Sequence, residues 1–403
     1  MQNTFARESV LKNVLRFSLP YLLSYFLQTL YGMADLLIIG QFDGVAGTTA
    51  VSIGSQVMHM VTVMLVGLAM GITVGIGHAV GAGENRRAGS TIGNGAVLFL
   101  VLSAALAALL AGLVGPITAI MSTPAEAVAG TRAYLTICFI GIPCITAYNI
   151  IAAIYRGLGD SKSPMYFIAV ACAANIVLDL VFMGALGMGP GGAALGTTLS
   201  QAISVVVSLA AILKRGLDGV QLQKSDFRPR RAIIGRILRV GVPVAMQDGL
   251  IQISFLIITV IANRRGLTDA AAVGVVEKFI SFVFLVPSSM LSTVSALGAQ
   301  EVGAGRHDVH RLRCGTASAL RWALVRWRPC WCSSSRRMSW GCSPPTPPSL
   351  RRARGICAGI FSTASLPGCI SVSAGISVPM AAASCRSSIT FCPSCSFACR
   401  GRT

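Results

Sequence analysis

The chain has 403 residues, of which 54% are hydrophobic and only 12% are charged. Soluble proteins carry about 25% charged residues, so this composition excludes an ordinary soluble protein and indicates an integral membrane protein. A formal net charge of +19 would suit a nucleic-acid partner, but residues 311–403 alone hold 13 Arg and no Asp or Glu. The positive charge therefore comes mainly from one end of the chain, and we expect no nucleic-acid partner. From the apolar composition we expect a lipid bilayer around the protein.

Eight stretches up to residue 302 are long and apolar enough to cross a bilayer, which takes about 20 residues of helix. Lipid offers no partner to unpaired backbone groups, so spans of this length must be helical. The sequence therefore predicts an all-α integral membrane protein. The expected spans are residues 17–40, 51–80, 91–120, 133–155, 164–184, 192–213, 233–262 and 271–302.

Loops that contain Lys and Arg alternate along the chain with loops that contain neither. The N-terminus and the loops at 81–90, 156–163 and 214–239 are basic, whereas the loops between them contain no Lys or Arg. Cytoplasmic loops of membrane proteins carry the excess of Lys and Arg. We therefore predict a multi-pass protein of the cell membrane, a bacterial inner membrane, with a cytoplasmic N-terminus. Arg264 and Arg265 are the exception, because they fall on the predicted outer side.

The chain also repeats itself. The segment "SLPYLLSYFLQ" resembles "GVPVAMQDGLIQ", which aligns Pro20 with Pro243, and "VGAG" occurs at 80–83 and again at 302–305. Duplicated bundles of this kind are common in transporters. We predict a six-helix N-terminal lobe at residues 1–223 and the start of a second lobe at 224–310.

Residues 311–403 form a third region, which breaks this pattern. They contain no Asp, Glu, Lys, Asn, Gln or Tyr and ten of the 13 Cys. If the codons of Cys330-Trp331-Cys332 are read in either shifted frame, they encode residues typical of membrane helices. We hypothesise that the frame is lost near residue 311 and that the tail is out-of-frame translation; a genuine Cys-rich extension is the alternative. The Cys spacing in "CPSCSFAC" superficially resembles part of a metal site, but ten Cys produce such spacings by chance, and we expect no metal.

Polar side chains inside the spans are the candidates for function. Asp35 lies well within the first span, where an Asp costs about 2.5 to 3.5 kcal/mol on insertion scales, and Gln28 lies nearly two turns earlier. Asn175 and Asp179 are four residues apart on the fifth span and share a face, and Thr197 opens the sixth. We interpret them as a hydrated site for a proton or a small cation. The alternative is that each side chain only bonds neighbouring helices.

The chain resembles the MATE family, the multidrug and toxic compound extrusion transporters. The resemblance rests on "LPYLLSYFLQTLYGMADLLIIG", "VGAGENRRA", "YRGLGDSKSP" and "NIVLD" together with the internal repeat, and it extends from residue 10 to about residue 310. It implies a bundle of twelve helices in two six-helix lobes that face a central cleft. About eight of the twelve are intact here.

The resemblance also implies a function and a site. Such proteins are not enzymes and need no cofactor; they export cationic amphipathic compounds against Na+ or H+, and we expect a monomer. The residues that match the N-lobe cation site of prokaryotic members are Gln28, Asp35, Asn175, Asp179 and Thr197.

The second lobe departs from the family pattern. Members with a Glu in the seventh helix carry it where this chain has Ile251. Asp248, Gln252 and Glu277 remain candidates for a second-lobe site.

Three other functions remain possible on these grounds. A lipid-linked oligosaccharide flippase of the same superfamily would need basic residues in its cleft to hold a pyrophosphate, and Lys278 is the main such residue within the spans. A frameshifted, non-functional product is the second alternative. A membrane-surface or nucleic-acid-binding protein that uses its Arg-rich tail is the third.

Restoring the reading frame tests the hypothesis on the tail. Correction of one base near codon 311 is expected to restore four hydrophobic spans, because the shifted frames encode apolar residues. Resequencing the gene across codons 300 to 330 measures this directly. A continuous frame confirmed through codon 403 would contradict it.

Overall fold

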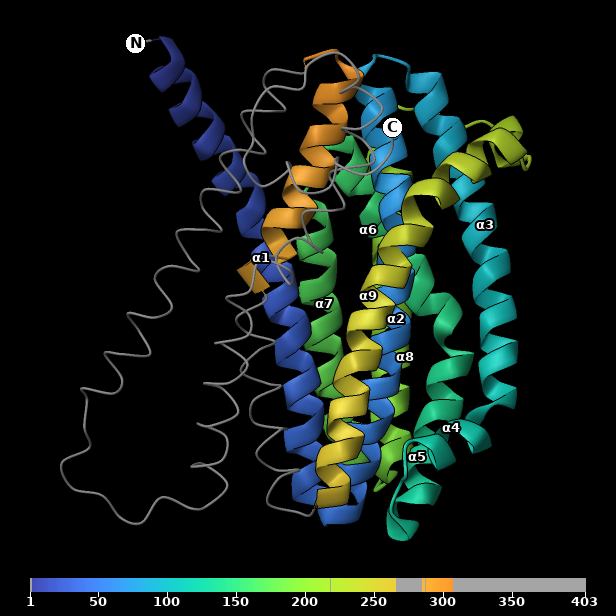
Figure 1. The fold of residues 1–403 in the computed structure, drawn as a ribbon. Helices are drawn as coiled ribbons and strands as arrows, with labels where there is room; N and C mark the ends of the chain where they lie inside the picture. The colour runs from blue at the N-terminus through green and yellow to red at the C-terminus, as the bar shows by residue number, and fades with distance from the viewer. Residues whose placement is uncertain (1, 218, 266–284, 287, 307–403) are drawn as a thin grey trace, which may run out of the picture. The chain divides into compact units, whose positions relative to one another are not determined.

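The structure is a computed structural model that describes residues 2–265 except 218, together with 285–286 and 288–306. Its named elements in this part of the chain are all helices (Figure 1). The described elements include a π-helical turn (Leu180–Ala185), a 3-10 helix (Lys224–Phe227) and a helix at residues 288–303. The α-helices are α1 (Gln2–Phe42), α2 (Gly44–Gly81), α3 (Asn85–Gly112), α4 (Val114–Ile120), α5 (Ala125–Ile140), α6 (Ile142–Leu158), α7 (Lys162–Asp179), α8 (Gly189–Arg215) and α9 (Arg231–Arg265).

Six of these helices are long and apolar enough to cross a membrane, and α5 with α6 can form a seventh span, bent by 50°. The prediction of an all-α membrane fold is confirmed. The first seven expected spans each correspond to one of these helices or to the bent pair. The start of the eighth, at 271–302, and the whole tail from 311 lie outside the described residues.

Prolines interrupt two spans that the sequence predicted to be continuous. The stretch at 91–120 breaks between α3 and α4, and Pro116 follows the last residue of α3 by four positions. The stretch at 133–155 breaks at Gly141, with Pro143 in the first turn of α6. A proline has no N–H to donate, and its ring collides with the carbonyl four residues earlier. The helix therefore ends and restarts at both places.

The sequence "RGLGDS" ends one helix and begins the next. Gly159 has φ 93°, a conformation that glycine adopts without strain, and it ends α6. One residue later the Oδ1 atom of Asp160 accepts the backbone N–H groups of Lys162 at 2.8 Å and Ser163 at 3.1 Å. These bonds satisfy free donors in the first turn of α7 and start that helix at a defined place.

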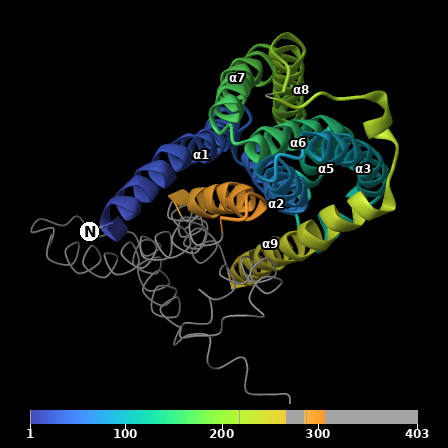
Figure 2. The same ribbon diagram turned by 90° about the horizontal axis from the view of Figure 1, so that it is seen from above.

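Among the six unbent spans, the helix α2 is the most enclosed. In its apolar window 56% of the residues are buried, against 17% in the windows of α1 and α3. It packs against α9, α6, α5 and α3, and in Figure 2 it lies between α6 and the 288–303 helix. Lipid gives helices no hydrophobic reason to associate, so close approach through small residues stabilises such contacts.

The repeat of "VGAG" is also a repeat of structure. At the end of α2, Gly83 has φ 73° and donates its N–H to the carbonyl of Val80 at 3.0 Å. At the end of the 288–303 helix, Gly305 has φ 71° and donates to the carbonyl of Val302 at 3.1 Å. Both helices therefore end in the same cap, 222 residues apart in the chain.

The two capped helices contact each other reciprocally. A Cβ atom at Gly81 would overlap the carbonyl of Gln300, and one at Gly303 would overlap the carbonyl of His78. Gly81 and Gly303 are equivalent positions of the repeat, and so are His78 and Gln300. The contact therefore has local two-fold symmetry, and only glycine allows the backbones to lie this close.

A buried carboxylate fixes the loop between α8 and α9 to α3. Asp226 accepts the hydroxyl of Ser90 at 2.8 Å and the N–H of Gln223 at 3.0 Å, and its carbonyl accepts the amide of Asn94 at 3.0 Å. The Asn94 oxygen in turn accepts the N–H of Arg230 at 2.6 Å. We call this cluster the Asp226 clip. The hydrogen bond from the Gln223 backbone holds the pKa of Asp226 below its usual value.

The Asp226 clip predicts a pH-dependent loss of stability. Asp226→Asn removes an ionised acceptor of two hydrogen bonds and is expected to lower the stability by about 1–3 kcal/mol at neutral pH. Because the folded-state pKa is lowered, this contribution is present above the usual carboxyl pKa of about 3.9 and is lost as pH falls through the lowered pKa. The gap between wild type and Asp226→Asn should therefore close toward low pH.

Thermal unfolding of the purified protein in detergent, measured from neutral to acidic pH, checks this. Glu126→Gln is the matched control, because Glu126 is exposed in the first turn of α5. Equal unfolding of both variants at neutral pH would show that the clip does not stabilise the fold.

Candidate functional site

Three helices bring together four of the five predicted N-lobe residues. Asp35 on α1 is 4% exposed, and Asn175 and Asp179 on α7 are 1% and 0% exposed. The carboxyl group of Asp35 lies against Asp179 and Asn175. The Thr197 hydroxyl on α8 donates to the Oδ2 atom of Asp35 at 3.3 Å. Their role in binding a cation stays a prediction, but the geometry places two carboxyl groups, an amide and a hydroxyl at one point.

Most polar atoms at this point lack a protein partner. Oδ1 of Asp35, both carboxyl oxygens of Asp179 and both amide atoms of Asn175 make no hydrogen bond to a described residue. A buried carboxylate without a partner is costly, and two adjacent carboxylates repel unless a proton or a cation lies between them. The arrangement is therefore suited to hold a positive charge. Oxygen atoms are also the ligands that hard cations prefer.

The chain around Asp179 departs from α-helical geometry. The helix α7 passes directly into the π-helical turn at Leu180–Ala185, in which Leu186 donates its N–H to the carbonyl of Val181 at 2.9 Å. Single π-helical turns inside helices occur frequently at functional sites. This one begins at the residue after the carboxylate.

Gln28 lies apart from the carboxylates. It lines a separate cavity of about 30 Å³, together with Tyr21, Tyr148 and Arg156 among others. Seven residues of helix correspond to about 10 Å along the axis, so Gln28 and Asp35 share a face of α1 at different depths. A role for Gln28 in binding a cation stays a prediction.

The candidates for a second-lobe site are only partly described. Asp248 on α9 faces α2, and its Oδ2 atom lies 3.2 Å from the place of a Cβ at Gly67. Gln252 follows one turn later and is half-buried, whereas Glu277 lies outside the described residues. A second-lobe site stays a prediction.

Two polar residues, each one helical turn from a residue of the site, were missed. Tyr31 is one turn before Asp35 on α1 and lies within electrostatic reach of it. Gln201 on α8 is buried, and its Oε1 atom has no partner among the described residues. Tyr31 is four residues from Asp35, and Gln201 is four residues from Thr197. This helical spacing could have identified both residues.

The buried charges of the described part have one sign. Among the Asp, Glu, Lys, Arg and His residues of the described part, the buried ones are Asp35, Asp179, Asp226 and Glu301, all of them acidic. In the same part of the chain, no group of three or more His, Cys, Asp and Glu side chains could hold a metal ion. The acidic side chains of this interior therefore favour a cation or a proton over an anion.

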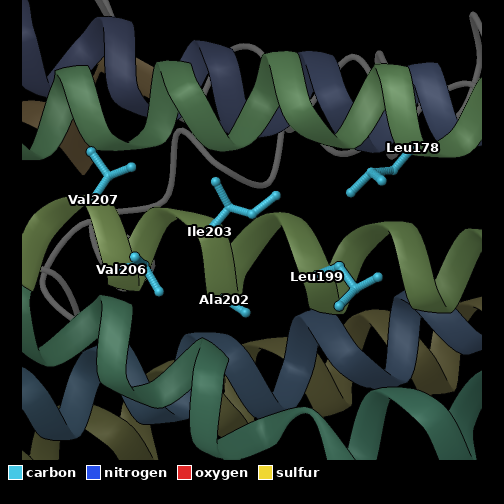
Figure 3. A pocket seen from close by; sticks show the side chains of 6 residues that line it. All are labelled: Leu178, Leu199, Ala202, Ile203, Val206 and Val207. Atoms are coloured by element: carbon cyan, nitrogen blue, oxygen red, sulfur yellow. The ribbon is translucent and has the colours of Figure 1, made fainter.

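A groove of about 330 Å³ between α7 and α8 is chemically different from this site. Its side chains are all aliphatic, and Figure 3 shows those of Leu178, Ile203 and Val207 between the two helices. Such a lining offers dispersion contacts but no ligand for an ion. The complete lining is Leu178, Leu199, Ala202, Ile203, Val206 and Val207.

Comparison with known proteins gives a family match and curated relatives. Residues 20–181 and 243–324 match the family model described as MatE. The chain is 29% identical over 301 residues to YpnP of Bacillus subtilis, named a probable multidrug resistance protein, an alignment that covers 75% of this chain and 67% of YpnP. It is 30% identical over 241 residues to NorM of Thermotoga maritima, which carries the same description; 59% of this chain and 51% of NorM are covered.

A solved structure has the same fold. The crystal structure of a MATE protein in complex with MaL6 superposes with a TM-score of 0.73 at 22% identity, covering 79% of this chain and 71% of that one. At this identity the likeness shows the fold alone. The family model, however, matches more than half of the residues, and we conclude that this chain belongs to the MatE family.

Proposed function

We propose that this protein is a secondary active multidrug efflux transporter that exports cationic amphipathic compounds against Na+ or H+. The observation that carries the proposal is the buried pair of Asp35 and Asp179, most of whose oxygens have no protein partner. Relatives named multidrug resistance proteins support the class of substrate.

Competition for the carboxylate pair would couple the two fluxes. The empty, ionised pair attracts a cationic compound from the cytoplasmic side. Na+ or protons that enter from outside neutralise the pair and release the compound outward. Each ligand drives the lobes toward one state by its differential affinity for the two states.

Hydrogen bonds between the 288–303 helix and the predicted first lobe would have to break when the lobes change state. Tyr25 and Ser292 share a hydrogen bond of 2.9 Å between their hydroxyls, and the Gln300 amide donates to the carbonyl of Gly157 at 2.9 Å. Both bonds join the predicted first lobe to the 288–303 helix.

The proposal includes the setting of the transporter. It is a monomer in a bacterial inner membrane with its N-terminus in the cytoplasm, and it needs no cofactor besides the coupling ion. The basic loops at 81–90 and 156–163 support the orientation.

The flippase is less well supported. A pyrophosphate would need buried Arg or Lys, whereas the buried charges of the described residues are acidic. The frameshifted product remains the other alternative. Residues 311–403 lie outside the described part, although the family match continues to residue 324.

Asp35 is the residue whose replacement tests the proposed function. In the frame-restored protein, Asp35→Asn keeps the size and one hydrogen-bonding oxygen but cannot carry a charge. We expect folding to survive and ion-driven efflux to fall at least about tenfold, the loss that accompanies about 1.4 kcal/mol of coupling. The measurement is efflux of a fluorescent cationic dye from vesicles with equal amounts of each variant.

Gln28→Ala is the matched control for Asp35→Asn, since Gln28 lies on the same helix but outside the carboxylate pair. It is expected to have a milder effect. Transport by Asp35→Asn at the wild-type rate would mean that Asp35 is structural and that the cation site is elsewhere.

The 403-residue product itself is expected to export no dye. If the tail is out of frame, the cleft lacks most of its second wall. Growth of a pump-deficient host in the presence of a toxic cation measures this. Resistance conferred by the 403-residue product would contradict the expectation.

A further inference from the structure

Gly196 of α8 lies where the carboxylate of Asp179 meets the neighbouring helix. A Cβ atom at Gly196 would overlap the Oδ1 atom of Asp179 and would lie 3.2 Å from its Cγ atom. The carboxylate oxygen therefore occupies the volume that any other side chain at position 196 would need. Asp179 is 0% exposed, so its side chain has little room to move away from an added methyl group.

The residues that follow Gly196 contact two further parts of the site. Thr197 donates to Asp35 on α1. Thr198 packs at the break between α5 and α6, where its Oγ1 atom is 2.7 Å from the place of a Cβ at Gly141. Three consecutive residues of α8 thus contact α7, α1 and the α5–α6 break. A shift of α8 to relieve a clash at Gly196 would disturb the other two contacts.

Other glycines of α8 have different neighbours. A Cβ at Gly191 would meet only Ile137, at 3.7 Å, which is an ordinary contact. A Cβ at Gly192 would lie 3.1 Å from the backbone carbonyl carbon of Phe182, which cannot rotate away. Among these three glycines, a methyl group at Gly196 alone would collide with the end of a side chain, so it would displace the carboxylate before it displaces the backbone.

We infer that Gly196 is a positioning residue: its missing side chain sets the place of the Asp179 carboxylate and thereby the affinity of the pair for the coupling cation. The inference rests on the proposed function of this pair. The residues facing the Asp179 carboxylate are Asp35 from α1 and Gly196 from α8. If the Asp179 carboxylate were displaced, Asp35 would be left with an incomplete set of oxygens around the cation.

Ion-dependent thermal stability of the full purified chain tests this inference. A cation that binds only the folded state stabilises it by RT ln(1 + [L]/Kd), where [L] is the free cation concentration, so weaker binding requires more cation for the same rise in unfolding temperature. Na+ and pH titrations of wild type, Gly196→Ala and the control Gly191→Ala are compared. We expect Gly196→Ala to need at least about ten times more Na+, or a proton concentration shifted as much, for the same rise in unfolding temperature, since a misplaced ligand of a coordinated ion costs about 10–100-fold in affinity. Gly191→Ala is expected to respond like wild type.

Asp35→Asn, in the same titrations, separates failure of this inference from failure of the proposed function. If Asp35→Asn abolishes the response and Gly196→Ala leaves it unchanged, the positioning role of Gly196 is wrong while the cation site stands. If Asp35→Asn responds like wild type, the cation site is wrong and the positioning role is wrong with it.

A double variant covers the case in which Gly196→Ala does not fold. Removal of the carboxylate removes the clash, so Gly196→Ala combined with Asp179→Ala is expected to recover the unfolding temperature of Asp179→Ala alone. A double variant that unfolds as readily as Gly196→Ala would show that the methyl group collides elsewhere, which overturns the inference.

Discussion

Two carboxyl groups lie side by side inside a helical bundle that a bilayer surrounds, and much of the local architecture depends on that arrangement. Neither the lipid nor the apolar core can solvate them. The carboxyl groups of Asp35 and Asp179 come from different helices, and the amide of Asn175 and the hydroxyl of Thr197 lie with them. These groups can converge only if α1, α7 and α8 lie close together at one depth. The geometry of the three helices at this depth is therefore part of the site.

Small residues make that convergence possible. Close approach of helix backbones replaces the hydrophobic effect as the stabilising contact within a membrane. Gly71 of α2 lies against the backbone of Ile237, and Gly241 of α9 lies against the backbone of Leu68. The same principle operates at Gly196, where the close partner is a carboxylate. Glycines thus serve both the packing of the lobes and the placement of a charge.

Much of this fold was predictable because its signals are local. Runs of apolar residues predicted the spans, and the four-residue spacing predicted that Asn175 and Asp179 share a face. The breaks near Pro116 and Pro143 were also local signals, but the hydrophobicity of the surrounding stretches outweighed them. Spacing alone did not reveal the distance between Gln28 and the carboxylates, because a helical face extends along the whole helix.

The remaining features depend on contacts between distant parts of the chain. The π-helical turn after Asp179 has no evident signature in "LVFMGA", because it arises where α7 packs against α1 and α8. The contact of Gly196 with Asp179 likewise joins two helices that must first be placed. Ser90 and Asn94 look like ordinary polar residues of α3 until Asp226 is brought to them by the loop.

The Asp226 clip also determines which part of the chain can act as a hinge. It anchors the loop before α9 to α3, so the first turn of α9 is held at that helix. In the proposed transport cycle, a rotation of one predicted lobe against the other would then be absorbed farther along α9. Pro243 lies inside that helix and has no N–H to bond the preceding turn. The weakest point of α9 therefore lies a few turns beyond its anchor, and bending there would swing Asp248 and Gln252 relative to α2 while the start of the helix stays in place.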